Sequence, residues 1–194
     1  MSVEPPILAG AIDPRIAGEL PGLGLSWCAF EVDADPLRRS PTELRARLRR
    51  LSDRWRGADA IALRSRPIPH AYRVLFRSLG LEPDVDRVPV EAYVLERLRR
   101  GAFPSRGVLA DALLLGCVET GVGVWACDAA GPLRLALADE RVSVVNDAGV
   151  IARAFSAPPP VTSRHLTVFA VTAAGVPPIA VEEALWTAWD LLVN

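Results

Sequence analysis

Three acidic residues stand where a carboxylate could do chemistry. Asp111 lies inside the apolar stretch 108–118, Asp128 directly follows the apolar run 124–127, and Glu119 lies near the turn between them. A buried carboxylate costs free energy unless it is hydrogen-bonded, and an acid with a shifted pKa can serve as a general acid or base. An Asp beside a turn or helix end more often accepts hydrogen bonds from backbone amides than it acts as a catalytic acid or base. The pattern therefore favours structural anchoring for Asp111 and Asp128 and leaves acid–base chemistry as the alternative.

Other catalytic and cofactor motifs are missing from the chain. It has no lysine, so it cannot form a lysine-bearing phosphate loop, and Gly121-Val122-Gly123 leads into an expected strand and not into a helix. The serine elbow pattern is absent. The three cysteines lie in apolar stretches without zinc-site spacing, and His70 and His165 lack a visible catalytic partner. We expect no metal or cofactor, buried thiols and structural histidines.

Charge is distributed unevenly along the chain. All 22 basic residues are arginines, and 17 of them lie between Arg38 and Arg106, where there are only eight acidic residues. This segment carries nine surplus positive charges, while the rest of the chain is acidic. A cationic face of this kind attracts a phosphate backbone. Arginines on solvated helix faces are the open alternative, because a basic face is not a recognition code.

Composition limits the class of protein. The chain has 194 residues, is 51% hydrophobic and carries a formal net charge of −1. These values predict a globular chain with a substantial core, and the apolar fraction excludes disorder. The stretch 108–118 is about half the roughly 20 residues that a membrane span requires. Residues 1–10 lack the pattern of a secretion signal. We expect a cytoplasmic protein that does not bind membranes, and the sequence leaves its oligomeric state open.

Hydrophobic spacing predicts helices followed by strands. Ser40 and Glu43 fit a capping box that opens a helix, and Gly57 would end it. Asn146-Asp147-Ala148-Gly149 is typical of a hairpin turn. Further helices are expected at about 70–79, 89–100, 108–118 and 181–193, and strands at 25–32, 122–127, 133–138, 141–145, 150–155 and 165–171. Because helices cluster in the middle and strands after them, we predict a single α+β domain over residues 1–194, with a mainly C-terminal antiparallel or mixed sheet.

Several runs of residues together match the pattern of a known protein family. They are Tyr72 to Pro83, Glu91, Leu95, Arg97 to Gly101, Pro104, Asp111 and Glu119 to Asp128. With this spacing the chain resembles the B3/B4 tRNA-editing domain of the phenylalanyl-tRNA synthetase β chain, and still more the free-standing proteins built from that domain. The resemblance is best over about residues 60–194. It implies an α+β fold and aminoacyl-tRNA as a partner.

The resemblance also implies a site, which departs from the family pattern. Asp111 matches the Asp of a Val-Asp-x-Thr-Asn motif, but Leu113 and Leu114 replace its Thr and Asn. Asp128 matches the Asp of a His-Ala-Phe-Asp motif, but Trp125 replaces its His. The expected pocket residues are Asp111, Glu119, Trp125 and Asp128, and the expected RNA-binding residues are Arg73, Arg77, Arg99, Arg100 and Arg106.

Three hypotheses follow. The first is a free-standing domain that binds aminoacyl-tRNA and removes a wrongly attached amino acid in trans. The second is a module of the same fold that binds RNA or a protein without catalysis, because apolar residues replace groups that would orient water and stabilise an oxyanion. The third is a binding protein for an amino acid or similar small molecule.

Overall fold

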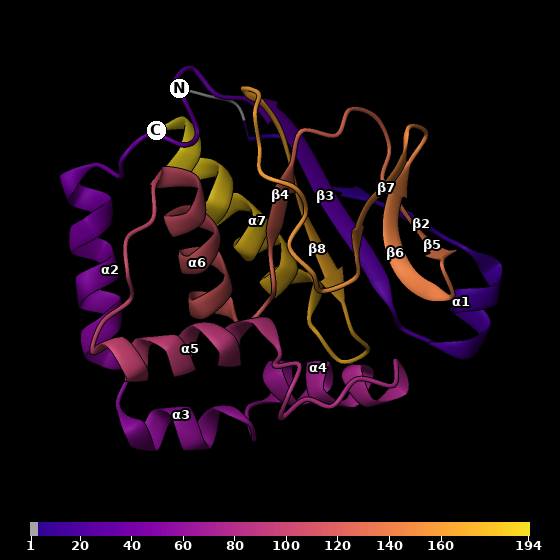
Figure 1. The fold of residues 1–194 in the computed structure, drawn as a ribbon, viewed down its shortest axis with the longest axis horizontal. Coiled ribbons are helices and arrows are strands. Elements are labelled where there is room, and N and C mark those ends of the chain that lie inside the picture. The colour runs from indigo at the N-terminus through magenta and orange to yellow at the C-terminus, as the bar shows by residue number, and fades with distance from the viewer. Residues whose placement is uncertain (1–3) are drawn as a thin grey trace.

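The strands form two four-stranded sheets (Figure 1). The structure, a computed structural model, describes residues 4–194, so the first three residues of the predicted domain lie outside the described part. The first sheet is antiparallel, in the order β1 (Leu8–Ala9), β3 (Gly24–Glu31), β8 (His165–Thr172) and β4 (Trp125–Cys127). The second has the order β2 (Ala11–Ile12), β5 (Arg134–Ala138), β6 (Arg141–Asn146) and β7 (Gly149–Arg153). Only the β2–β5 pair is parallel, so the second sheet is mixed.

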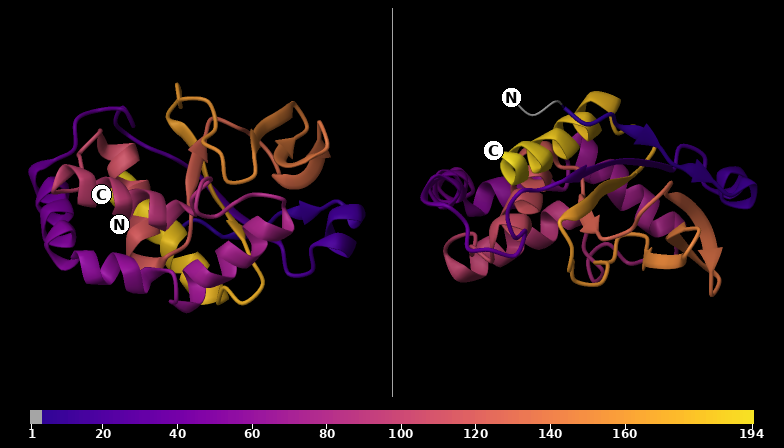
Figure 2. Two further views of the ribbon diagram at one scale, coloured as in Figure 1. Left: turned by 60° about the horizontal axis from the view of Figure 1, so that its bottom comes forward. Right: turned by 90° about the horizontal axis from the view of Figure 1, so that it is seen from above.

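The described part of the chain has seven helices. They are α1 (Pro14–Glu19), α2 (Thr42–Arg54), α3 (Gly57–Leu63), α4 (Pro67–Ser78), α5 (Pro89–Arg100), α6 (Val108–Thr120) and α7 (Pro178–Val193). Helices α2, α3, α5 and α6 lie on one side of the molecule, and the second sheet lies on the other (Figure 1). Helix α7 packs on β8 and β3 and also on α6, so it joins the helical side to the first sheet (Figure 2).

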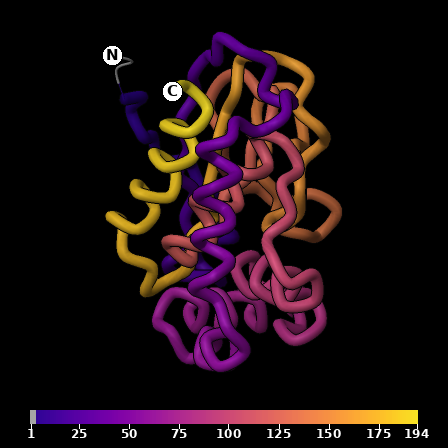
Figure 3. Tube along the Cα trace, turned by 90° about the vertical axis from the view of Figure 1, so that its left-hand side faces the viewer, coloured from indigo at the N-terminus to yellow at the C-terminus, as the bar shows by residue number. Residues whose placement is uncertain are grey.

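The core is continuous from the first sheet to the helices. Strand β8 has buried side chains at six successive positions, 166–171, which is the pattern of a strand covered on both faces. Helix α6 is buried over most of its surface because α2, α5 and α7 all pack against it. Seen from the side of α2, helix α7 stands next to α2, and α3 to α5 lie below (Figure 3). Tyr72 of α4 ties these layers together, since its hydroxyl donates a hydrogen bond of 3.0 Å to the carbonyl of Val171.

Most of the predicted elements are confirmed, and the α+β class is correct. Helix α5 has the predicted bounds and ends at Gly101, whose φ of 82° suits glycine. The predicted hairpin joins β6 to β7, with Asn146 paired to Gly149. Strand β8 begins at His165, where a strand start was expected.

Two predictions about α2 are wrong. The capping box at Ser40 and Glu43 does not form, because α2 begins at Thr42 behind Pro41 and has no side-chain cap. The Ser40 hydroxyl instead donates a hydrogen bond to Asp111. Helix α2 also ends at Arg54, before the expected stop, and Gly57 begins the short helix α3, which the sequence did not predict.

None of the helices within residues 4–194 is long and apolar enough to cross a membrane. Over the same residues, no three or more His, Cys, Asp or Glu side chains are grouped as metal ligands.

Candidate functional site

Asp111 is almost fully buried at the start of α6, and its carboxylate accepts three hydrogen bonds. The hydroxyls of Ser40 and Ser105 both donate to Oδ2 over 2.6 Å, and the backbone N–H of Arg106 donates to Oδ1 over 2.8 Å. These donors come from the segments that precede α2 and α6. The carboxylate therefore holds two loops against the start of a helix. This is the structural role that the sequence favoured for Asp111.

Glu119 lies on the last turn of α6 and forms an ion pair with Arg47 of α2. The distance from Nη2 of Arg47 to Oε2 of Glu119 is 2.6 Å, and Nε of Arg47 donates to Oε1 over 3.4 Å. This two-point contact links α2 to α6 across 72 positions of sequence. Glu119 is thus engaged on the helical side of the molecule.

Asp128 follows β4 and anchors the proline-rich loop that precedes β8. One oxygen accepts hydrogen bonds of 2.6 Å from both the backbone N–H and the hydroxyl of Thr162, and the other accepts one of 3.2 Å from the backbone N–H of Ser163. Desolvation opposes ionisation of this carboxyl, but the hydrogen bonds together outweigh it and lower the pKa of Asp128. Asp128 therefore fixes the loop before β8 to the end of β4.

Trp125 belongs to an aromatic cluster next to β4. Its ring stacks on Phe169, with centroids 5.9 Å apart, and meets Phe155 edge to face at 6.0 Å. Phe155 also contacts Phe76 at 4.8 Å and Tyr72 at 5.9 Å. Edge-to-face and offset contacts of this kind are favourable for aromatic rings. Through Phe155, Trp125 is in contact with the lining of a cavity next to the second sheet.

That cavity, which we call the aromatic hollow, has a volume of about 650 Å³ and lies between the end of α4 and the second sheet. Phe76 and Phe155 supply its aromatic wall, and Arg141 of β6 and Arg153 of β7 are exposed on it. Neither arginine is in an ion pair within residues 4–194. The remaining lining residues are Glu19, Leu20, Ser78, Leu79, Gly80, Leu81, Asp86, Leu137, Glu140, Val142, Ala154 and Ser156.

Phe155 has a left-handed backbone conformation, with φ of 63°. This conformation is uncommon for a bulky residue and persists only where the surroundings hold it. The contacts of its ring with Trp125, Phe76 and Tyr72 supply that constraint. Phe155 was expected at the end of a regular strand. The sequence did not predict its left-handed backbone conformation, because that conformation is unusual for phenylalanine. Arg141 and Arg153 were missed because they lie outside the arginine-rich segment.

Arg73 does not lie on a phosphate-facing surface. Its side chain is 7% exposed, and its guanidinium contacts Glu91 at 2.9 Å and Asp84 at 3.0 Å. Burial opposes the charge on Arg73, but the two carboxylates outweigh that effect and raise its pKa. Burial also raises the pKa of Glu91 against the influence of the arginine. Arg73 is therefore the centre of an internal ion pair between α4 and α5.

The other four predicted arginines are exposed. Arg77 lies on α4 and Arg99 on the last turn of α5, and within residues 4–194 neither has a carboxylate at ion-pair distance. Arg100 and Arg106 share Glu96, with Nε of Arg100 at 2.9 Å from Oε1. Arg77 and Arg99 thus keep their full charge for a ligand, and Arg100 and Arg106 are partly neutralised.

The ends of α2 and α5 meet at Ser52. Its carbonyl accepts a hydrogen bond of 3.0 Å from Nε of Arg97, and its hydroxyl accepts one of 2.9 Å from the backbone N–H of Phe103. The junction lies at one corner of the molecule (Figure 1), and exposed arginines occur in or next to both helix ends. We call this set the arginine corner, and it comprises Arg54, Arg56, Arg99 and Arg100.

The three thiols do not offer a nucleophile. Cys28, Cys117 and Cys127 are free and buried. Burial raises the pKa of Cys28 to about 12 and also raises the pKa of the other two. A thiol attacks as its thiolate, so none of them is activated.

No protein-family model, curated protein or solved structure matches this chain.

Proposed function

We propose that the protein is a B3/B4-like domain that binds aminoacyl-tRNA without Asp111-dependent hydrolysis. The observation that carries the proposal is the aromatic hollow, which is lined by the half-buried ring of Phe155 and by Arg141 and Arg153, two arginines without an ion pair in residues 4–194. The carboxylates of Glu19, Asp86 and Glu140 also line it. Unpaired bases of an RNA end stack on aromatic rings, and arginines bind the adjoining phosphates. The resemblance of residues 72–128 to the editing domain supports aminoacyl-tRNA as the RNA.

The arginine corner supports a second contact with the tRNA backbone. It contains Arg99, which has no ion-pair partner in the described part of the chain, and Arg100 next to it. The corner and the aromatic hollow lie toward opposite ends of the molecule (Figure 1). A long polyanion can contact both, whereas a mononucleotide cannot.

The contacts of the predicted acids support binding over catalysis. Asp111 accepts three hydrogen bonds, Glu119 pairs with Arg47, and Asp128 closes a loop. A hydrolytic site needs donors aimed at the developing oxyanion and a group that orients water. The polar groups that would have met this need in the family motif are replaced by Leu113, Leu114 and Trp125.

The first test measures tRNA binding as a function of salt. Fluorescence anisotropy with labelled tRNA is expected to give a dissociation constant that rises steeply with salt, because bound phosphates release counterions. The double variant Arg99→Ala/Arg100→Ala should reduce the slope of log K against log salt by about one for each phosphate that the variant no longer binds. The matched control, Arg15→Ala/Arg164→Ala, removes the same charge from exposed positions elsewhere. Equal losses of affinity in both double variants would reject the arginine corner.

The second test addresses the aromatic hollow and catalysis. Arg141→Ala/Arg153→Ala should weaken binding of intact tRNA and leave binding of tRNA without its 3′ terminal nucleotides unchanged. With a panel of correctly and incorrectly charged tRNAs, the protein should release no amino acid above background. Release from one mischarged tRNA would show trans-editing and overturn the non-catalytic part of the proposal.

A further inference from the structure

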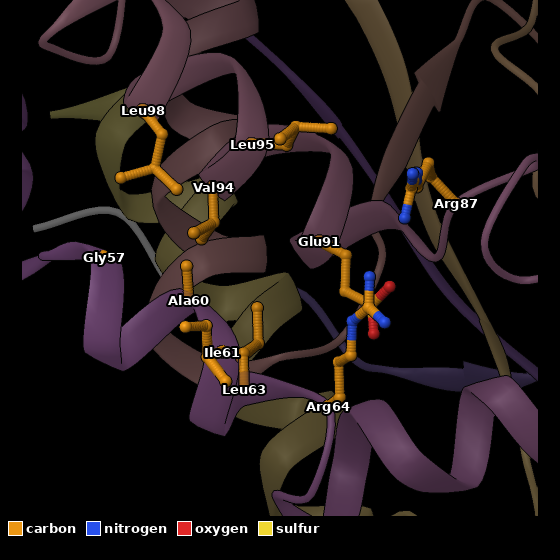
Figure 4. A pocket seen from close by; sticks show the side chains of 10 residues that line it. All are labelled: Gly57, Ala60, Ile61, Leu63, Arg64, Arg87, Glu91, Val94, Leu95 and Leu98. Carbon is orange, nitrogen blue, oxygen red and sulfur yellow. The ribbon is translucent and has the colours of Figure 1, made fainter.

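A second cavity, of about 570 Å³, lies between α3 and α5, apart from the residues used above for RNA (Figure 4). We call it the α3–α5 groove. Its volume is within the roughly 300–1,000 Å³ typical of small-molecule sites. One end carries Arg64, Arg87 and Glu91, and Gly57 lies at the other. The wall between them is aliphatic and is formed by Ala60, Ile61, Leu63, Val94, Leu95 and Leu98.

The charged end has more guanidinium groups than carboxylates. Asp84 is shared by three arginines, with distances of 3.1 Å to Arg64, 3.0 Å to Arg73 and 3.6 Å to Arg87. The second carboxylate, Glu91, contacts Arg73 at 2.9 Å. Three positive charges therefore face two negative ones. Arg64 and Arg87 are the two guanidinium groups with side chains open to a ligand, at 51% and 32% exposed.

The aliphatic wall is accessible from outside. Ile61 is 78% exposed and Leu98 is 37% exposed. A ligand with an apolar chain would cover both side chains, and the removal of apolar surface from water favours its binding. Apolar walls with a few converging polar groups at one end are the usual form of a small-molecule site.

We propose that the α3–α5 groove binds a small amphipathic carboxylate, with its aliphatic chain between α3 and α5 and its carboxylate on Arg64 and Arg87. Guanidinium groups bind carboxylates with paired, charge-assisted hydrogen bonds. A free amino acid fits less well, because its ammonium group would lie beside the positive charges of Arg64 and Arg87, and Glu91, the carboxylate that lines this end, is already paired with Arg73. This inference does not depend on tRNA binding.

The test uses octanoate as the probe and the full chain as the protein. Isothermal titration and thermal unfolding should show saturable binding of octanoate and a higher unfolding temperature. Butanoate should bind more weakly because it buries fewer methylene groups. Octylamine should not bind, because its charge has the wrong sign, and octanol should bind roughly tenfold more weakly than octanoate.

Two pairs of variants locate the site. Ile61→Asp places a carboxylate on the exposed apolar wall and should abolish octanoate binding, whereas Ile179→Asp, at a 65% exposed position on α7, should not affect it. Arg87→Gln should weaken binding roughly tenfold, and Arg77→Gln is its control. All four side chains are substantially exposed or open to the groove, so we expect each variant to fold. The unfolding temperature of each variant without ligand checks this.

Three results would overturn the proposal. The first is no stabilisation by carboxylates from four to twelve carbons. The second is equal binding of octanoate by the Ile61→Asp variant, which would place the ligand elsewhere. The third is a concentration-dependent dimer of the wild-type chain that Ile61→Asp dissociates, because the groove would then hold a second copy of the protein.

Discussion

The hydroxyl of Ser40 donates a hydrogen bond of 2.6 Å to Oδ2 of Asp111, across 71 positions of sequence. Ser40 precedes α2, and Asp111 lies in the first turn of α6. The same carboxylate holds Ser105 and the backbone of Arg106, so one buried group positions the start of two helices. Asp111 is thus a structural anchor, as its position in the sequence favoured.

Replacing Asp111 by Ala should destabilise the protein by about 3 kcal/mol. The substitution leaves the buried hydroxyl of Ser40 and the part-buried donors of Ser105 and Arg106 without their acceptor, and a buried donor without an acceptor costs about 1–3 kcal/mol. Urea denaturation measures the free energy of unfolding. Asp53→Ala, at an exposed position on α2, is the control and should change it by less than about 0.5 kcal/mol. A loss at Asp111 no larger than that of the control would contradict the anchoring role.

The fold was predictable wherever local pattern and tertiary environment agree. The proline start and glycine end of α5 and the turn before Gly149 each follow from neighbouring residues. Ser40 shows where this fails. Its position before a helix suits a cap, but a buried carboxylate 71 residues away competes for the same hydroxyl. Helix α3 was missed because it is short and begins at a glycine, which sequence patterns treat as a stop.

The candidate site was much less predictable than the fold. Charge counting along the chain could not distinguish Arg73, which is buried against Glu91 and Asp84, from Arg77, one helical turn further on and exposed. It also missed Arg141 and Arg153, which the hairpin of β6 and β7 brings to the aromatic hollow. Which charge is free depends on long-range packing, and the sequence does not show that packing.

Arg73 and Arg77 therefore make a matched pair of variants on α4. Arg73→Ala should destabilise the protein by roughly 3 kcal/mol, because it leaves the carboxylate of Glu91 buried without its partner. Arg77→Ala should change stability by less than about 0.5 kcal/mol. Chemical denaturation of both variants tests the pair. If both variants lose the same free energy of unfolding, the buried Arg73–Glu91 pair does not stabilise the fold as proposed.

The hydrogen bonds of Asp128 predict a specific pH dependence of stability. Because its pKa is lowered in the folded state, its contribution is fully present above the unfolded value of about 3.9 and is lost as pH falls through the folded value. Asp128→Asn replaces one acceptor oxygen by a donor facing Thr162 or Ser163. The gap in unfolding temperature between wild type and variant should be constant near neutral pH and should narrow below about pH 4. Asp53→Asn, on the surface of α2, is the control. A gap that widens in acid would contradict a lowered pKa of Asp128 in the folded protein.

Close packing between α6 and α7 makes Gly116 a further test of the fold. A Cβ atom at this position would lie 2.8 Å from the carbonyl oxygen of Ala184, which belongs to the backbone of α7 and cannot move cheaply. Alanine gains about 1 kcal/mol over glycine in helix propensity, but forcing a methyl group into a packed core costs about 1–3 kcal/mol. Gly116→Ala should therefore lower the free energy of unfolding. In α1, Gly18→Ala meets nothing within 4 Å and should raise that free energy by up to about 1 kcal/mol. Urea denaturation of the two variants should give shifts of opposite sign, and stabilisation by both would show that α6 and α7 lie further apart than in this structure.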